Sequence, residues 1–467
     1  MPFKHSASLA ALLAVAACSA NPVILSGTSN RVAPSGTYNR VTPSGTYNRV
    51  TPSGVEGRRT TPIQHVIFVV QENRSFNNLF LGYPGAKTRG YGYDERGNKI
   101  VLQPEPLAEG WDLGHTSQDF FKACDGRGKL PGTKCRMDGW NNEFASFGAP
   151  ANAPYSYVVR KDVGVYWKMA RQYVLADRTF ASNLDGSFIA HQYIVAAYAS
   201  GAVDTPDSAW GCEGGSGDTI GTLTAKRAYG PSIVACFNNP TIASEADAAG
   251  VSWRFYAGAI NGSGGLWSSY QADSQIFDGR DWSTDVISPP SQFLADIAAG
   301  TLANVTWITP TFGNSDHPGV NPDAGPAWVA SIVDAVGASK FWKSSAIFLM
   351  WDDWGGFFDP VRPVLEDYDG LGFRVPLIVI SPYAKQGYVT HVQYETSSVL
   401  RYIEDNFNLP PMAKSDARAS DPAADAFDYS QQPRAFKKFR GALSPAYWNA
   451  RDRAAQRVAP RGTGHGD

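Results

Sequence analysis

Short apolar runs that alternate with helical stretches are the feature that most constrains this chain. The runs consist mostly of β-branched and aromatic residues and have the length of buried strands: 66–70, 174–180, 251–256, 304–310, 346–354 and 375–383. Apolar residues recur at helical spacing in 187–200, 291–299, 326–338 and 395–406. Buried strands that alternate with helices build a mostly parallel sheet with helices on both faces. We therefore predict an α/β fold, a three-layer α/β/α sandwich around a mostly parallel central sheet.

The composition indicates one large folded domain with insertions. Of the 467 residues, 43% are hydrophobic and 18% are charged, which suits a globular protein with a sizeable core. Glycine-rich segments at 82–150 and 202–240 are expected to form loop-rich insertions over one end of the sheet. The formal net charge of −2 gives no excess of positive charge that would attract nucleic acid, and we predict no such partner.

The N-terminus has the pattern of an export signal. Lys4 and His5 precede an apolar segment at 7–17, which is too short to span a bilayer as a mature helix. The sequence VAAC ending at Cys18 resembles the lipobox of bacterial lipoproteins, in which the cysteine is lipidated. An ordinary signal peptide cut near residue 20 is the alternative. We predict a signal peptide over 1–20 and an exported protein that is periplasmic, secreted, or anchored in the outer membrane through Cys18.

A nine-residue repeat separates this signal from the rest of the chain. Residues 26–54 read SGTSNRVAP, SGTYNRVTP, SGTYNRVTP and SG, with glycine and proline in every full unit and no apolar periodicity. Such a segment cannot bury a core, so we predict a linker over 21–60. A catalytic domain is expected over 61–410. The C-terminal extension, 411–467, is expected to contain some helix and to be partly disordered.

Cysteine usage agrees with export. Apart from Cys18, four cysteines remain, and an even number in an oxidising compartment predicts disulfides. Three pairings are possible. The sequential one closes two local loops and is the one that we favour: Cys124–Cys135 and Cys212–Cys236. A zinc site is the rival interpretation, but the chain contains no CxxC pair.

Two apolar strands end in polar clusters. Glu72 and Asn73 follow the strand at 66–70, and Asp352 and Asp353 follow the one that begins at 346. In open α/β sheets, ligands bind beyond the carboxyl ends of the strands. Adjacent carboxylates are costly to ionise together unless a cation neutralises them, and hard divalent cations prefer oxygen ligands. Helix caps at the first cluster and a polar strand exit at the second are the alternatives.

A serine begins one of the helical stretches. Ser187 follows a predicted turn at Asp185 and Gly186, where free backbone amides and the helix dipole favour anions. Ser187 is either an N-cap or, with its hydroxyl activated by a nearby cation, a nucleophile. His191 lies four residues later on the same helix face and could meet a phosphate held near the serine. A packed or capping histidine is the alternative.

Two further loops carry candidate catalytic groups. Asp316 and His317 lie in a loop bounded by glycine and proline after the strand at 304–310, and Asp112 and His115 lie in the first insertion. Loops on a rigid scaffold are common places for catalytic residues.

Four of these motifs together resemble a known family. QENRSF at 71–76, DGSFIAHQY at 185–193, SDHPG at 315–319 and WDDWGGFFD at 351–359 occur in the same order in phosphoesterases. That family contains the phosphatidylcholine-type phospholipases C and related acid phosphatases, and it is similar to the alkaline phosphatase superfamily. The resemblance covers residues 62–407 and implies an alkaline-phosphatase-like fold.

The resemblance also implies roles for individual residues. A single divalent metal ion of unknown identity would be held by Glu72, Asn73, Asp352 and Asp353, with Ser187 as both ligand and nucleophile. Ser187 would attack phosphorus and form a phosphoserine that water hydrolyses. Three histidines, His115, His191 and His317, would bind the phosphoryl oxygens or assist proton transfer. Two aspartates, Asp316 and Asp112, would orient these groups.

The chain departs from the phospholipase C pattern in three ways. Pro360 stands where family members often carry histidine after GGFFD, and Asp353 stands where the phospholipases often carry glutamate. Those phospholipases also often carry C-terminal β domains, for which this sequence leaves no room. We therefore expect a phosphomonoesterase of the acid phosphatase type, with a phospholipase C as the alternative. Its substrate would be a phosphorylated small molecule or a phospholipid head group.

A surface lipoprotein that binds a ligand without turnover is a hypothesis from another class. The repeat linker and the aromatic richness of the chain would suit it. Loss of hydrolysis on substitution of Ser187 separates a catalyst from a binding protein.

Overall fold

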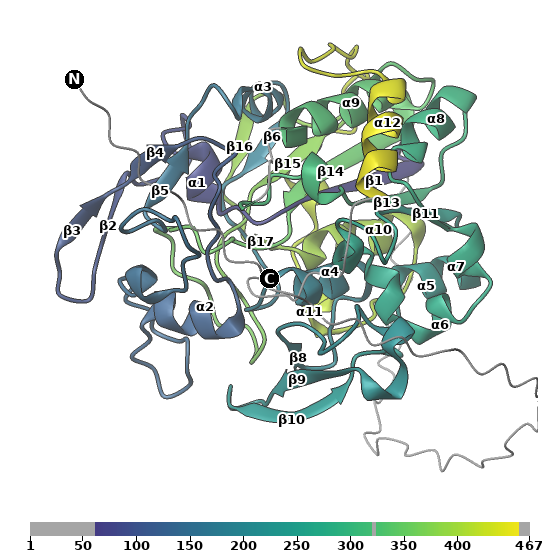
Figure 1. Cartoon of the computed structure of the whole chain (residues 1–467). Helices are drawn as coiled ribbons and strands as arrows, with labels where there is room; N and C mark the ends of the chain where they lie inside the picture. Colours follow the sequence, from purple (N-terminus) through teal and green to yellow (C-terminus); the bar gives the residue numbers. More distant parts are fainter. Residues whose placement is uncertain (1–60, 320–323, 457–467) are drawn as a thin grey trace, which may run out of the picture. The chain divides into compact units, whose positions relative to one another are not determined.

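The computed structural model describes residues 61–319 and 324–456. The predicted signal peptide with Cys18, the predicted linker and the predicted tail after residue 456 lie outside the described residues. An eight-stranded sheet forms the centre (Figure 1). Its strands, in spatial order, are β12 (Val286–Ile287), β11 (Trp253–Tyr256), β13 (Val305–Ile308), β1 (His65–Gln71), β14 (Ser345–Trp351), β15 (Leu377–Ile380), β6 (Val174–Ala176) and β16 (Tyr388–Thr390).

The sheet is mostly parallel, as predicted. Only β15 runs antiparallel to its neighbours, and all other adjacent strands of this sheet are parallel. Strand β1 lies between β13 and β14, and six of its seven residues are buried. Burial on both faces explains why this strand is a continuous apolar run rather than an alternating one.

Helices cover both faces of the sheet (Figure 1). One layer contains α3 (Gly164–Gln172), α8 (Gln292–Ala299), α9 (Gly325–Gly337) and α12 (Pro445–Gln456). The other contains α4 (Ser187–Ala196), α5 (Ile242–Ala249), α10 (Ser397–Phe407) and α11 (Lys414–Arg418). Three short helices lie outside these two groups: α1 (Phe76–Phe80), α6 (Ser274–Phe277) and α7 (Asp281–Thr284). The predicted three-layer α/β/α fold is confirmed.

The strand predicted at 174–180 is divided. Its first half is β6, and its end is β7 (Thr179–Phe180), which pairs with β17 (Tyr394–Glu395) in a separate two-stranded sheet. Asp177 lies at the break. Its carboxylate accepts hydrogen bonds from the backbone N–H of Lys87 at 2.8 Å and from His391 Nδ1 at 2.8 Å. These contacts explain a change of direction that the apolar pattern does not reveal.

The two predicted insertions form small sheets of their own. The first contains β2 (Tyr91–Tyr93), β3 (Lys99–Val101), β4 (Gln103–Glu105) and α2 (Ser117–Cys124), and β4 pairs with β5 (Ser156–Val158), which lies just after the predicted insertion. The second contains β8 (Ala202–Val203), β9 (Thr219–Leu223) and β10 (Tyr229–Val234). Each insertion holds one disulfide of the sequential pairing: Cys124–Cys135 and Cys212–Cys236.

Residues after 410 pack against the rest of the domain. On α12, the buried Trp448 contacts Trp328 with ring centroids 5.1 Å apart and donates a hydrogen bond to Ser331 Oγ at 2.9 Å. The buried carboxylate of Asp452 accepts hydrogen bonds from the N–H of Ser291 at 2.9 Å and from Asn314 Nδ2 at 2.7 Å. The described part of the extension is therefore part of the same packed domain. None of the helices in the described part of the chain has the length and apolar content needed to cross a bilayer.

Candidate active site

The polar clusters after β1 and β14 lie side by side. These two strands are parallel neighbours with Gln71 opposite Trp351, so the residues that follow them emerge at the same edge of the sheet. The N–H of Asp352 donates to the carbonyl of Gln71 at 3.0 Å, and the N–H of Asn73 donates to Asp352 Oδ1 at 2.9 Å. The two strand ends are thus joined directly.

The backbone at Asn73 turns sharply. Asn73 has φ 57°, a left-handed conformation that asparagine tolerates better than most residues. Gly355 approaches it closely, because a Cβ atom at position 355 would lie 2.0 Å from the carbonyl oxygen of Asn73. The glycine after the paired aspartates therefore permits the close contact of the two strand ends.

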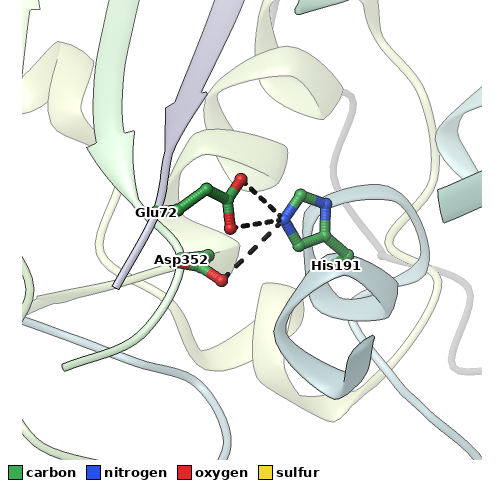
Figure 2. A group of neighbouring side chains, drawn as sticks. All are labelled: Glu72, His191 and Asp352. Atoms are coloured by element: carbon green, nitrogen blue, oxygen red, sulfur yellow. Dashed lines mark hydrogen bonds and ion pairs between the residues drawn. The ribbon is translucent and has the colours of Figure 1, made fainter. Parts of the chain in front are cut away.

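One half of the site, here named the carboxylate half, consists of Glu72, His191 and Asp352 (Figure 2). His191 Nε2 lies 3.2 Å and 3.4 Å from the two carboxylate oxygens of Glu72 and 3.8 Å from Asp352 Oδ2. One ligand atom from each side chain lies within 4.8 Å of the others, and all three residues are buried.

The carboxylate half fits a divalent metal ion. Asp352 Oδ2 is buried and accepts no hydrogen bond from the described residues, so it has a lone pair available for a ligand. Two buried carboxylates are costly to ionise side by side unless a cation neutralises them. Carboxylate oxygen and imidazole nitrogen are both ligands for divalent metal ions.

The other half, here named the serine half, consists of Asn73, Ser187, Asp353 and His115. Asn73 Nδ2 lies 3.2 Å from Ser187 Oγ and 3.3 Å from Asp353 Oδ2, within hydrogen-bond distance of both. Ser187 Oγ in turn lies 3.4 Å from Asp353 Oδ2 and 3.4 Å from Asn73 Oδ1. The serine hydroxyl therefore faces a carboxylate that can accept its proton.

Helix α4 contributes to both halves. Gly186 is its N-cap and Ser187 its first residue, so Ser187 does not fill the capping position that we considered for it. The amides of the first turn of a helix have no acceptor within the helix, and they favour anionic groups placed there. His191, one turn later, reaches the carboxylate half rather than the space beside Ser187.

The first insertion brings His115 to the serine half. His115 Nδ1 lies 2.8 Å from the carbonyl oxygen of Leu113, which requires a proton on Nδ1. In the neutral ring, Nε2 then accepts a hydrogen bond from Asn73 Nδ2 at 2.7 Å. This contact fixes the orientation of the Asn73 amide, a role that the sequence did not predict.

His317 lies at the same end of the site. Its ring centroid is 6.2 Å from that of His115. The buried Trp267 contacts His317 at 5.9 Å between centroids and stacks on His191 at 6.4 Å. Trp267 belongs to the short 3-10 helix η3 (Gly265–Trp267), and no spacing in the sequence indicated that it borders the site.

One of the two predicted orienting aspartates, Asp316, points away from His317. Asp316 Oδ2 accepts hydrogen bonds from the Tyr166 hydroxyl at 2.8 Å and from Trp351 Nε1 at 3.0 Å, so its carboxyl faces the core and not His317. Burial raises the pKa of Asp316 to about 7. Asp112 Oδ1 accepts from the N–H of Leu113 at 2.8 Å, and Leu113 in turn holds His115 through its carbonyl. Asp112 is therefore linked to His115 through the backbone of Leu113.

An acidic pair next to Ser187, the buried Asp185 and the half-buried Asp204, was not anticipated. Asp185 Oδ1 accepts from the N–H of Gly186 at 2.9 Å, and Oδ2 accepts from the N–H of Asp204 in the second insertion at 3.0 Å. Burial, with a smaller contribution from the negative charge of Asp204, raises the pKa of Asp185 well above its usual value. In the sequence, only the predicted turn at Asp185 and Gly186 drew attention to Asp185.

Comparison with known proteins identifies the family. A model of the Phosphoesterase family matches residues 63–410, about three quarters of the chain. The chain belongs to the Phosphoesterase family. This agrees with the resemblance that the four motifs indicated.

Its relatives include phospholipases C. Phospholipase C B of Mycobacterium tuberculosis is 27% identical over 414 residues, which cover 75% of this chain and 74% of that protein. Non-hemolytic phospholipase C of Burkholderia pseudomallei is 24% identical, and the match covers 74% of this chain and 55% of that protein. Non-specific phospholipase C1 of Arabidopsis thaliana is 24% identical over 77% of this chain and 70% of its own length.

Among solved structures, the fold is similar to that of a protein in the alkaline phosphatase superfamily from Vibrio parahaemolyticus. The TM-score is 0.36 at 10% identity, over 77% of this chain and 70% of that one. From its family and relatives, this phosphoesterase is a hydrolase that acts on phosphoester bonds.

Proposed function

We propose that the protein hydrolyses phosphoesters through a phosphoserine at Ser187, with one divalent metal ion. The observation that supports this best is the position of Ser187 Oγ at the start of α4, 3.4 Å from Asp353 Oδ2. The serine half supplies the nucleophile and the acceptor of its proton. The carboxylate half, joined to it through Asn73 and Asp352, supplies buried negative charge for a cation.

In the first step, Ser187 Oγ forms a bond to phosphorus while the bond from phosphorus to the leaving oxygen breaks. Asp353 accepts the serine proton, and His317, or His115 once it is doubly protonated, protonates the leaving alcohol. Free amides of the first turn of α4 donate to the phosphoryl oxygens. In the second step, water attacks phosphorus while the bond from phosphorus to Ser187 Oγ breaks. The histidine that protonated the leaving alcohol takes a proton from the water, and Asp353 returns its proton to Ser187. The product is phosphate from a monoester and a phosphate monoester such as phosphorylcholine from a diester.

The metal would be held by Glu72, Asn73, Asp352 and Asp353 together with Ser187. When bound, it would lower the pKa of the serine hydroxyl and offset the charge on the phosphoryl oxygens. His191 is a further candidate ligand because its Nε2 lies against Glu72 and Asp352. The identity of the metal follows from elemental analysis of the purified protein.

For the substrate, we propose the phosphodiester of a phospholipid, cleaved in the manner of a phospholipase C. The relatives named above support this choice, since they match about three quarters of the chain. The sequence departures at Asp353 and Pro360 favoured phosphate monoesters instead. That preference stays a prediction, and we place it second.

We also propose that the protein is exported. The signal-like pattern at 1–20 and the two disulfides support export, and Cys18 would attach the protein to a membrane if it is lipidated. Cell fractionation of the full chain and of its C18S variant tests both points. Recovery of the two proteins in the cytoplasm would contradict export.

A substrate panel tests the activity and its chemistry. Wild-type protein and Ser187→Ala are compared on p-nitrophenyl phosphate, p-nitrophenyl phosphorylcholine and phosphatidylcholine. We expect hydrolysis of the two diesters by the wild type and a phosphorylcholine adduct on Ser187 in acid-quenched samples, detected by mass spectrometry. Hydrolysis of the monoester alone would restore the acid phosphatase prediction. A fully active Ser187→Ala variant would exclude the phosphoserine.

A further inference from the structure

A short loop beside the site exposes two aromatic rings. Residues 143–148, EFASFG, follow the 3-10 helix η1 (Trp140–Asn142) in the first insertion and are here named the aromatic loop. The side chain of Phe144 is 49% exposed, and that of Phe147 is fully exposed at 103%. An exposed phenylalanine ring loses the free energy that its burial in an apolar environment would provide.

The aromatic loop is bonded to the segment that carries His115. The N–H of Gly114 donates to the carbonyl of Phe144 at 2.8 Å, and the N–H of Ser146 donates to the carbonyl of Asp112 at 2.9 Å. Ser146 Oγ also accepts from the N–H of Asp112 at 2.7 Å. His115 follows directly after this pairing, so the loop has a fixed backbone connection to the serine half of the site.

The base of the loop is held while its tip projects. The N–H of Phe144 donates to Asp119 Oδ1 on α2 at 3.3 Å, and Glu143, the first residue of the loop, is buried. Phe147, three residues after Phe144, extends into solvent with its whole ring accessible. A projecting ring on an ordered backbone suits a fluid apolar phase, because such a phase closes around the ring without a preformed pocket.

We propose that the aromatic loop inserts Phe144 and Phe147 into a phospholipid surface and so presents lipid head groups to the site. This inference rests on the proposed phospholipase C function, whose substrate resides in such a surface. Aromatic side chains favour the boundary between water and lipid, and each buried ring adds to the affinity. The loop would raise turnover of aggregated lipid more than turnover of a soluble ester.

Vesicle binding tests the proposal without catalysis. Full-length wild type, Phe144→Ser/Phe147→Ser and Phe147→Ser are sedimented with phosphatidylcholine vesicles in the presence of a chelator. We expect the double variant to lose at least about tenfold in its partition coefficient, and the single variant to lose less. The matched control is Leu443→Ser, which removes a side chain of similar exposure (42%) in the segment before α12. We expect it to bind as the wild type does.

Activity measurements separate failure of this inference from failure of the proposed function. The ratio of activity on phosphatidylcholine vesicles to that on p-nitrophenyl phosphorylcholine should fall at least about tenfold in the double variant. Equal vesicle binding by wild type and both variants would overturn the role of the loop, whatever the activity. No hydrolysis of any phosphoester by the wild type would instead refute the proposed function. Because the Phe147 ring is fully exposed, Phe147→Ser keeps the test decisive even if the double variant folds poorly.

Discussion

The two halves of the site share three elements but differ in chemistry. Glu72 and Asp352, which directly follow β1 and β14, belong to the carboxylate half, and the next residues, Asn73 and Asp353, belong to the serine half. Helix α4 gives His191 to the first half and Ser187 to the second, and the first insertion adds His115 to the second. Both halves contain a histidine, but the carboxylate half gathers two carboxylates, whereas the serine half gathers hydroxyl and amide around one carboxylate.

This division follows from chain geometry. The left-handed backbone at Asn73 turns the chain between Glu72 and the residues that follow, and residues four apart on a helix share a face one turn apart. Two adjacent residues on each strand end, and two residues one turn apart on α4, therefore supply two groups of side chains. The hydrogen bond from the N–H of Asn73 to Asp352 Oδ1 couples the groups through the backbone. Separate roles for the two halves predict separable effects of substitution.

The largest effect is expected for Ser187→Ala. Loss of the nucleophile should lower kcat by about 10³- to 10⁴-fold, because the covalent step is removed. Ser187→Ala removes one proposed metal ligand but keeps Glu72, Asn73, Asp352 and Asp353, so most of the bound metal should remain, as measured by elemental analysis alongside steady-state kinetics. Loss of metal together with activity would show that the halves are not separable.

Removal of a carboxylate from the carboxylate half should lower activity by weakening metal binding. Glu72→Gln and Asp352→Asn should each weaken metal binding by at least about 10- to 100-fold and lower activity accordingly. Titration of the metal-free protein followed by activity measurement checks this, and added metal should partly restore the rate. An active wild type that contains no metal after chelation would refute the metal assignment.

A smaller effect is expected for His115→Ala. The variant frees the Asn73 amide that His115 Nε2 holds, so kcat should fall by about tenfold without loss of metal. His65→Ala is the control, since His65 lies at the opposite end of β1 and contacts the carbonyl of Ala303. Equal losses in the two variants would indicate general destabilisation rather than a local role.

The smallest effect is expected on the pH dependence of stability, and it comes from Asp369, which belongs to neither half. Burial raises the pKa of Asp369 to about 7, and its carboxyl accepts a hydrogen bond from the Tyr193 hydroxyl on α4. The folded state then binds a proton that the unfolded state has already lost between about pH 4 and 7, so stability falls as pH rises through that range and levels off above it.

Asp369→Asn should flatten this decline, by at most about 1.4 kcal/mol per pH unit. Urea unfolding of wild type and variant at several pH values between 4 and 8 measures the slope. A parallel decline in both proteins would assign the pH dependence to other groups.

The sequence predicted which strand ends form the site better than it predicted where the side chains of the site point. Apolar runs with polar ends correctly placed Glu72 and Asp353 at one edge of the sheet, because strand burial and parallel pairing are determined locally and by general rules. The directions of Asp316 and His191 were not predicted. Asp316 faces Tyr166 and Trp351, which lie 150 and 35 residues away in the sequence, and such partners are known only once the chain has folded. The same holds for Asp185, whose partner Asp204 lies in an insertion with no regular pattern.

The packing of α12 has a practical consequence. The family match ends at residue 410, and a fragment cut there would contain every candidate catalytic residue. Such a fragment would nevertheless uncover Trp328 and leave Ser291 and Asn314 without the carboxylate of Asp452. The limit of sequence similarity and the limit of independent folding are therefore different positions in this chain, and the second lies beyond Asp452.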